Sequence, residues 1–250
     1  ELDFETTEAV NIINSWVSDR TRGNIDEIID SIDPETMMIL INAIYFNCVW
    51  EVAFDPGKTG RAPFYNADGS HLKEVDMMHL ESTFHTSFTE DFSAVELTYK
   101  NKKFSMSLFL PPAGSTVEEL VKGLDGATWN GWLETFSETE DFNVSMPRFK
   151  FEFERSLAGD LEQMGLGIAF TPQADFSGIS PVDLMISEVI HKTYIEVTEE
   201  GTEAAAVTGV VIGITSIGPP TSITLDRPFL FAITENTSRS ILFMGKVESP

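Results

Sequence analysis

The sequence contains little cysteine and few basic residues. A single cysteine among 250 residues, Cys48, excludes an internal disulfide framework and any paired-cysteine metal or redox motif. Only 16 Lys and Arg stand against 40 Asp and Glu, so the formal net charge is −24. This charge repels phosphate backbones and anionic lipid surfaces, and we therefore expect neither nucleic acid nor a membrane as a partner.

Long apolar runs and catalytic motifs are also missing. No apolar run approaches the ~18 residues of a membrane-spanning helix, and the first residues lack the basic and apolar regions of a signal peptide. The 4 histidines, at positions 71, 79, 85 and 191, lack the close spacing of a metal site. There is no G-x-S-x-G elbow, Walker loop, H-E-x-x-H motif or dinucleotide fingerprint. These absences favour a protein that is not an enzyme and needs no cofactor or metal.

The residues that are present predict a packed α+β protein. Hydrophobic residues make up 42% of the chain and include 19 Phe, which is ample for a core. Apolar spacing predicts helices over 7–22, 128–136 and 157–164, and a short one opened by Thr116. Alternating or continuous apolar runs predict strands at 37–50, 62–65, 71–78, 84–88, 94–99, 104–110, 142–153, 185–197, 223–234 and 240–247. With no repeat or linker, we expect one domain over 1–250.

One stretch does not fit this pattern. No charged residue occurs between Ala204 and Leu225, although charged residues make up 22% of the chain. Small residues fill its first part, β-branched residues follow, and the Gly-Pro-Pro of 218–220 ends any regular ladder. The stretch could form a strand, yet the sequence offers no obvious partner for it. Without further information, the chain could be an acidic β-rich binding module with a flexible loop.

Four blocks in order carry a resemblance to a known family. They are NAIYF at 42–46 with Trp50, IHK at 190–192 continuing to EEGTEAAA at 199–206, LDRPFLF at 225–231, and LFMGKV at 242–247. Together they resemble the serpins, serine-protease inhibitors that act through a suicide conformational change. The resemblance implies an α+β serpin fold with a large mixed central sheet, flanking helices and an exposed reactive-centre loop at about 199–222.

The resemblance also implies roles for individual residues. Asn42 and His191 would be hydrogen-bonded partners in the shutter beneath the central sheet, whereas the pattern alone makes His191 an ordinary core histidine. Trp50 would mark the breach, where the loop first enters the sheet. The hinge of the loop would comprise Glu199, Gly201, Thr202, Glu203, Ala204, Ala205, Ala206 and Thr208.

The hinge suits insertion as a central strand, because inward side chains there cannot be large or charged. Alternation places Thr202, Ala204, Ala206 and Thr208 on one face, all of them small, and Glu203 on the other. Counting from Gly201 by the family's interval puts the scissile bond at Thr215-Ser216, with Ile214-Thr215 as the runner-up. A small Thr215 favours an elastase-like or subtilisin-like serine protease, held as a covalent acyl complex.

Several expectations concern the whole protein. The chain begins at what resembles the sixth helix, so about the first third of a serpin is absent from it. We expect no heparin activation from so acidic a chain, and we expect a monomer that is secreted or extracellular. The alternative function is that of a non-inhibitory serpin-fold protein, such as a chaperone, a carrier or a protease substrate.

Overall fold

The computed structural model describes residues 2–4, 7–202 and 221–250. The chain forms two compact units, and each unit combines two separate segments of the sequence. Unit 1 comprises Glu1–Phe46 and Phe151–Ile195, and unit 2 comprises Asn47–Lys150 and Glu196–Pro250. The expectation of a single domain over 1–250 stays a prediction.

Unit 1 combines one amphipathic helix with long strands. Its elements are α1 (Thr7–Arg20), β1 (Ile39–Tyr45), most of β8 (Phe149–Ser156), α4 (Ala158–Leu161), η2 (Glu162–Leu166), η3 (Gly167–Phe170) and most of β9 (Glu188–Thr198). A core of Val17, Ile25, Ile28, Ile29 and Tyr194 joins α1 to the following loop and to β9. This burial explains why the spacing of apolar residues in 7–22 correctly predicts a helix.

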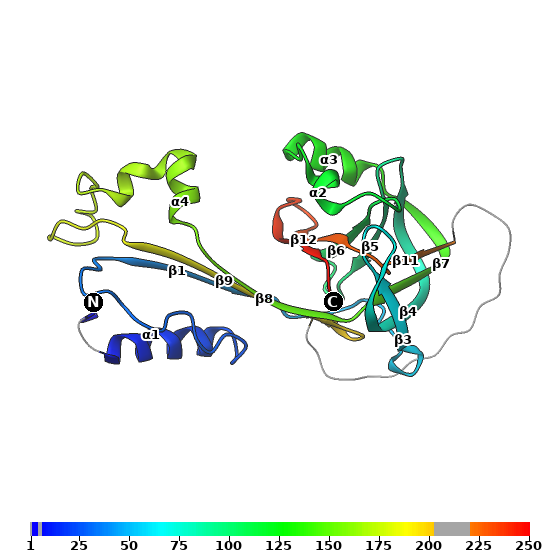
Figure 1. The fold of residues 1–250 in the computed structure, drawn as a ribbon, viewed down its shortest axis with the longest axis horizontal. Helices are drawn as coiled ribbons and strands as arrows, with labels where there is room; N and C mark the ends of the chain where they lie inside the picture. The colour runs from blue at the N-terminus through cyan, green and yellow to red at the C-terminus, as the bar shows by residue number, and fades with distance from the viewer. Residues whose placement is uncertain (1, 5–6, 203–220) are drawn as a thin grey trace. The chain divides into compact units, whose positions relative to one another are not determined.

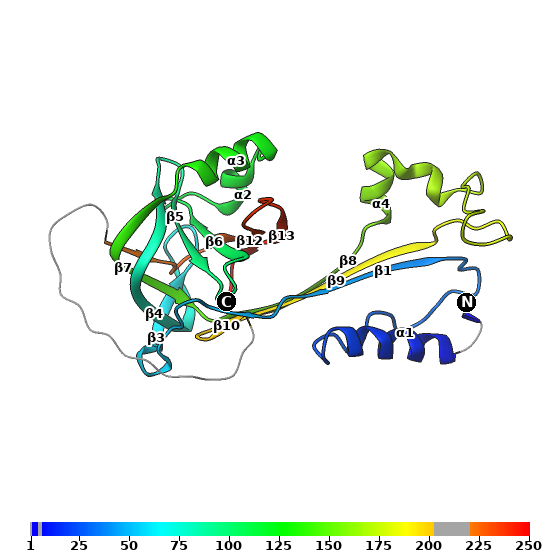
Figure 2. The ribbon, with the colours of Figure 1, turned by 180° about the vertical axis from the view of Figure 1, so that it is seen from behind.

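In unit 1, β1 and β9 are direct neighbours. They pair in parallel, from Ile39 opposite Glu188 to Tyr45 opposite Tyr194. The two strands run side by side in both views (Figures 1 and 2). Among the described residues β1 is covered on only one face, since the Leu40 side chain is 41% exposed. The run over 37–50 predicted a strand buried on both faces, so burial differs here from the prediction.

Unit 2 contains most of the strands. Its elements are β2 (Cys48–Val49), η1 (Pro56–Lys58), β3 (Gly60–Tyr65), β4 (His71–Phe88), β5 (Ser93–Thr98), β6 (Phe104–Leu110), α2 (Val117–Val121), α3 (Gly126–Glu134), β7 (Ser137–Pro147), β10 (Gly201–Thr202), β11 (Ser222–Thr224), β12 (Phe229–Glu235) and β13 (Ile241–Val247). The larger sheet has the order β11-β7-β4-β5-β6-β12-β13, with β3 added on β4. Figure 1 shows α2 and α3 close to β5 and β6.

Local sequence signals explain where the short helices of unit 2 begin. Thr116 caps α2 in a capping box, because its hydroxyl accepts from the Glu119 backbone N–H while the Glu119 carboxylate accepts from the Thr116 N–H. The Asp125 carboxylate caps α3 through the Thr128 N–H. Both helices then pack apolar side chains, among them Val117 and Trp129, on the sheet around Phe109.

The smaller sheet has the strand order β1-β9-β10-β2, and β8 pairs with β9. In unit 2 the two-residue strand β10 lies between the end of β9 and β2, antiparallel to both. A turn at Glu199-Glu200 reverses the chain from β9 into β10. Gly201 and Thr202, which lie just before the uncharged stretch, therefore have strand partners on both sides.

Candidate functional site

The site is built around Gly201 and Thr202, the two residues of β10. Gly201 is paired with Thr198 of β9 and Val49 of β2, and Thr202 is paired with Val197 and Cys48. Both hinge residues are buried, and Thr202 is 0% exposed. The start of the predicted hinge is therefore an interior strand of the sheet, with ladder partners on each side.

Position 201 accepts only glycine for two reasons. Its φ angle is +151°, a conformation that residues with a side chain rarely adopt. A Cβ atom there would lie 2.3 Å from the Cys48 carbonyl oxygen and 2.6 Å from the Val49 Cα. Both neighbours are backbone atoms of β2, so a side chain at 201 would push the two strands apart.

The Thr202 side chain ends on the phenol of Tyr99. The two oxygens, Thr202 Oγ1 and Tyr99 Oη, are 2.7 Å apart. The Tyr99 ring stacks on the Trp50 indole at 4.5 Å between centroids and 15° between planes. Trp50 in turn donates its Nε1–H to the Thr198 carbonyl at 3.0 Å. Burial raises the pKa of the Tyr99 phenol despite the bond to Thr202, so the phenol keeps its proton throughout the physiological range.

Glu199, in the turn before β10, is held from two directions. Its carboxylate accepts from Arg148 Nε at 2.9 Å to each oxygen and from Arg148 Nη2 at 2.5 Å, and it also accepts from the Thr59 hydroxyl. The Glu199 side chain is 5% exposed, against 45% for Arg148. Burial alone would raise the pKa of this carboxyl, but the hydrogen bonds from Arg148 and Thr59 outweigh it, and the pKa lies below its usual value.

Backbone hydrogen bonds fix the same turn to the segment after β2. The Trp50 N–H donates to the Glu200 carbonyl and the Phe54 N–H donates to the Glu199 carbonyl, at 2.9 and 2.8 Å. The turn is thus tied through its backbone as well as its side chains.

The predicted shutter pair belongs to unit 1. Asn42 and His191 are opposite each other in the β1–β9 register, and Asn42 Nδ2 is 3.1 Å from His191 Nδ1. The predicted hydrogen bond is therefore present, with His191 Nδ1 accepting. The role of this pair in opening the sheet stays a prediction. Next to it, Lys192 donates to the Glu27 carbonyl at 2.8 Å and lies 3.0 Å from the Glu154 carboxylate.

The rest of the predicted loop lies outside the described residues. This applies to five hinge positions and to the scissile-bond positions, which are Glu203, Ala204, Ala205, Ala206, Thr208, Ile214, Thr215 and Ser216. Their roles therefore stay predictions.

The sequence did not single out Tyr99, Arg148 or Thr59 as site residues. Tyr99 lies 103 residues before its partner Thr202, and Thr59 lies 140 residues before Glu199. No local pattern signals such partners. One usable hint was that Arg148 follows Pro147, which interrupts the alternating run predicted over 142–153.

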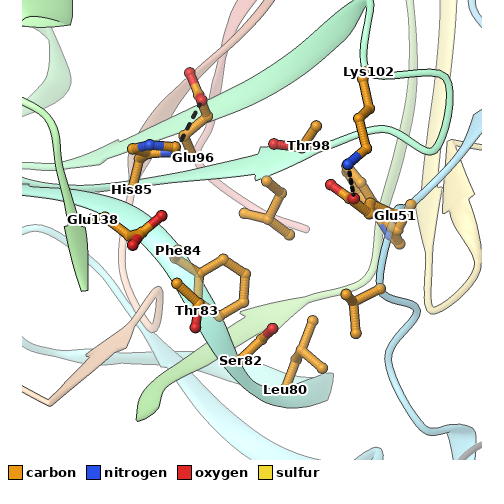
Figure 3. Close-up of a pocket in the computed structure, with 13 residues that line it drawn as sticks. Glu51, Leu80, Ser82, Thr83, Phe84, His85, Glu96, Thr98, Lys102 and Glu138 are labelled. Atoms are coloured by element: carbon orange, nitrogen blue, oxygen red, sulfur yellow. Dashed lines mark ion pairs between the residues drawn. The ribbon is translucent and has the colours of Figure 1, made fainter. Parts of the chain in front are cut away.

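A recess of about 310 Å³ lies beside Trp50 in unit 2, where β4 and β5 diverge (Figure 3). Two ion pairs flank it, Lys102 with Glu51 at 2.7 Å and His85 with Glu96 at 3.9 Å. Burial raises the pKa of the Glu96 carboxyl, and the nearby His85 opposes that rise. Three glutamates line the recess, and two of them, Glu51 and Glu96, lie beside a basic side chain.

Across 2–4, 7–202 and 221–250, no group of three His, Cys, Asp or Glu is placed to hold a metal ion. No helix in these ranges is both long and apolar enough to cross a membrane.

The fold and this site define a class of α+β protein in which a short buried strand, β10, lies between the end of β9 and β2. The comparisons with known proteins agree with that class. The family profile described as serpin (serine protease inhibitor) matches residues 1–250. The chain belongs to the serpin family, and the predicted α+β serpin fold is confirmed. The family takes its description from inhibitors of serine proteases, which are not catalysts.

Relatives cover the whole of this chain. It is 36% identical to human serpin B11 and 38% identical to human leukocyte elastase inhibitor, over 100% of the chain in both cases. It is 38% identical to Iripin-2 of Ixodes ricinus over 99% of the chain. The chain spans 66%, 69% and 63% of the length of these three relatives, respectively.

Solved structures show the same fold. Tengpin, a thermophilic serpin in its native state, matches with a TM-score of 0.87 and 34% identity, over 98% of this chain and 64% of that one. Human thyroxine-binding globulin in complex with thyroxine matches with a TM-score of 0.89 and 30% identity, over 100% of this chain and 66% of that one. The family thus includes a protein named as an elastase inhibitor and a protein named for binding thyroxine.

Proposed function

We propose that this protein inhibits serine proteases by cleavage of its loop and insertion of the freed segment into its central sheet. The observation that carries the proposal is the burial of Thr202 in β10, between β9 and β2. The sheet accepts hinge residues as an interior strand at this point. The small side chains at 204, 206 and 208 would follow on the same face without steric or electrostatic cost.

The protease carries out the chemical steps up to the formation of the acyl-enzyme. The protease serine oxygen attacks the Thr215 carbonyl carbon, the Thr215-Ser216 amide bond breaks, and the Ser216 amine leaves with a proton. The Thr215 acyl group is then an ester of the protease serine. Insertion of 201–215 as a strand moves that ester roughly 45 Å, at ~3.3 Å a residue, and we expect the protease to be distorted before deacylation.

Thr215 defines the class of target. Its short β-branched side chain cannot reach an acidic S1 pocket or fill a deep aromatic one, so elastase-like and subtilisin-like proteases are the proposed partners. The name of the human leukocyte elastase inhibitor, 38% identical to this chain, supports this choice. A shift of the scissile bond to Ile214-Thr215 would keep the same class of target.

A non-inhibitory role is the second candidate, since thyroxine-binding globulin has the same fold. The hinge sequence favours inhibition, because it has no proline and no bulky inward residue from 201 to 208. We further propose one serpin domain, a monomeric state and an extracellular location for the complete protein.

The test is a gel of the full-length protein mixed with an elastase-type or subtilisin-type serine protease. An SDS-stable complex is expected, and peptide mapping should place the cleavage within 211–217. Thr202→Arg would force a cation into a fully buried site, so this variant should be cleaved without forming a complex.

The matched control is Thr237→Arg, at an exposed position in the turn between β12 and β13, which should inhibit like the wild type. Continued complex formation by Thr202→Arg would rule out insertion. Complete cleavage of the wild type with no complex would favour the non-inhibitory alternative.

A further inference from the structure

We propose that Tyr99 is a positioning residue that sets the register in which the cleaved loop enters the sheet. The inference rests on the proposed inhibitory function and names a residue that acts on the inserting strand. It would do so by holding the Thr202 hydroxyl at one fixed point, so that the strand advances from Thr202 without slipping.

Register must be controlled in any added strand, because side chains alternate between faces. A slip by one residue would turn every inward side chain outward. It would place either Gly201 or Glu203 opposite Tyr99. Gly201 offers the phenol no partner, and Glu203 would bring a carboxylate into a site where Thr202 is 0% exposed. One-residue slips are therefore opposed by the burial of the site.

A slip by two residues keeps the inward side chains on the inward face, so something other than the alternation of faces must oppose it. It would place Glu200 or Ala204 opposite Tyr99. Between positions 200 and 207, Thr202 is the single residue with a hydroxyl. An alanine there would leave the buried Tyr99 phenol without this hydrogen-bond partner, which is costly. The 2.7 Å contact between the two hydroxyls therefore distinguishes the correct register from the forward slip to Ala204, which the faces tolerate.

The glycine before Thr202 supports the same register. The backbone atoms of β2 leave no space for a Cβ at position 201, where the nearest would be 2.3 Å away. A forward slip by two residues would move Glu203 into that position. Gly201 thus restricts register by shape and Tyr99 restricts it by hydrogen bonding.

The Tyr99 ring is held well enough to act as a fixed reference. It stacks on Trp50, and Trp50 donates to the Thr198 carbonyl of β9 at 3.0 Å. Thr198 is the strand partner of Gly201. The Tyr99 hydroxyl, which contacts Thr202, is therefore held in place relative to β9 through the stacked Trp50 ring.

Four variants of the full-length protein test this role. Tyr99→Phe and Thr202→Val each remove one hydroxyl, Thr202→Ser keeps it, and Tyr99→Phe with Thr202→Val replaces both partners. Tyr65→Phe on β3 is the control for loss of a phenol elsewhere. The readouts are the stoichiometry of inhibition, meaning inhibitor consumed per protease trapped, and the melting temperature.

We expect each single removal to raise the stoichiometry about fivefold, the change that loss of one hydrogen bond allows. Thr202→Ser and Tyr65→Phe should stay near the wild-type value. The double variant decides between the two roles of the contact. Its melting temperature should return toward that of the wild type, because no buried hydroxyl is left unpaired, while its stoichiometry should stay raised.

A double variant with wild-type stoichiometry would overturn the proposal, since the contact would then only stabilise the fold. A wild-type stoichiometry for Tyr99→Phe would overturn it as well.

If the wild-type protein traps no serine protease, the proposed function fails. The role of Tyr99 in register is then tested by an experiment that does not depend on inhibition. The loop is then cut with a metalloprotease, which forms no acyl-enzyme, and the rise in melting temperature on cutting is measured. Tyr99→Phe with Thr202→Val should show a smaller rise than the wild type, and an equal rise would overturn the proposal.

Discussion

Glu199 is a charged residue in an almost fully buried position, and its neighbours explain how the fold tolerates it. Arg148 donates to both carboxylate oxygens and Thr59 donates a third hydrogen bond. Burying a carboxylate is costly unless it is paired and hydrogen-bonded in this way. The pair holds the turn that leads into β10, so its effect should reach the hinge.

We predict that Glu199→Gln lowers the melting temperature by several degrees at neutral pH, because it removes the ion pair and leaves the Arg148 charge without its partner. The pKa of the Glu199 carboxyl is lowered in the folded state from a usual value of 4.5. Its stabilising contribution is therefore present above about pH 4.5 and lost as the pH falls through the folded-state pKa. Melting curves from pH 3 to 7 should show a smaller difference between wild type and variant at the acidic end.

The matched control is Glu118→Gln, which removes an exposed partner of Lys246 at a surface site. Screened surface pairs contribute little, so its melting temperature should change by about a degree or less. Equal changes in melting temperature for the two variants would show that the burial of Glu199 does not determine the size of the effect.

At the scale of elements, the two short helices of unit 2 depend on aromatic packing more than on length. The α2 and α3 helices have 5 and 9 residues, which is below the ~12–15 residues that a helix needs to be stable alone in water. Trp129 of α3 is 5% exposed and lies 5.6 Å from the Phe109 ring of β6. This contact is a main attachment of α3 to the sheet.

Trp129→Ala should therefore destabilise the protein by about 3–5 kcal/mol, the cost of removing a large buried aromatic side chain. Met164→Ala is the control, since the Met164 side chain is 79% exposed. This substitution should lower the free energy of unfolding by only about 0.5 kcal/mol or less. Denaturant titrations followed by circular dichroism would measure both. A loss of less than about 1 kcal/mol for Trp129→Ala would contradict the assigned packing.

Strand positions were predictable from the sequence where local signals were complete. The apolar run bounded by turns predicted β6 residue for residue, at Phe104–Leu110, and the Asn66–Gly69 cluster predicted the hairpin between β3 and β4. Joins and breaks were less predictable. The separate predictions at 71–78 and 84–88 are one strand of 18 residues, β4, which pairs with β3 in its first part and with β5 at its end.

Breaks within predicted strands have physical causes that lie partly outside the local pattern. The alternating run over 142–153 is divided near Pro147 into β7 and β8, since proline lacks the ladder donor. The apolar run over 37–50 is divided into β1 and β2. In unit 2 the partner of β2 is β10, which comes about 150 residues later, so the division could not be predicted from the run itself.

At the scale of the whole chain, the charge is the dominant feature. A formal net charge of −24 over these 250 residues leaves few basic residues to hold a polyanion. One structural relative, protease nexin-1, was solved with heparin. Because only 16 of these residues are Lys or Arg, against 40 Asp and Glu, we expect them to offer little basic surface for heparin.

We therefore predict that the protein passes through a heparin column at about 0.15 M salt, where the Debye length is ~8 Å and only a concentrated basic patch would bind. Heparin should also leave the rate of protease inhibition unchanged within about twofold. Retention at this ionic strength, or a tenfold acceleration by heparin, would contradict the prediction.

The placement of β10 bears on the kinetics of the proposed inhibition. Starting a new strand is the slow part of such a process, because neighbouring strands must separate before any ladder bond rewards them. Between β9 and β2 that separation already exists, and Gly201 and Thr202 occupy it. Insertion of the cleaved loop would still have to separate β1 from β9, which pair directly over Ile39–Tyr45, but it would propagate from an existing nucleus. In the competition with deacylation, the inhibitor would begin with its first step already completed.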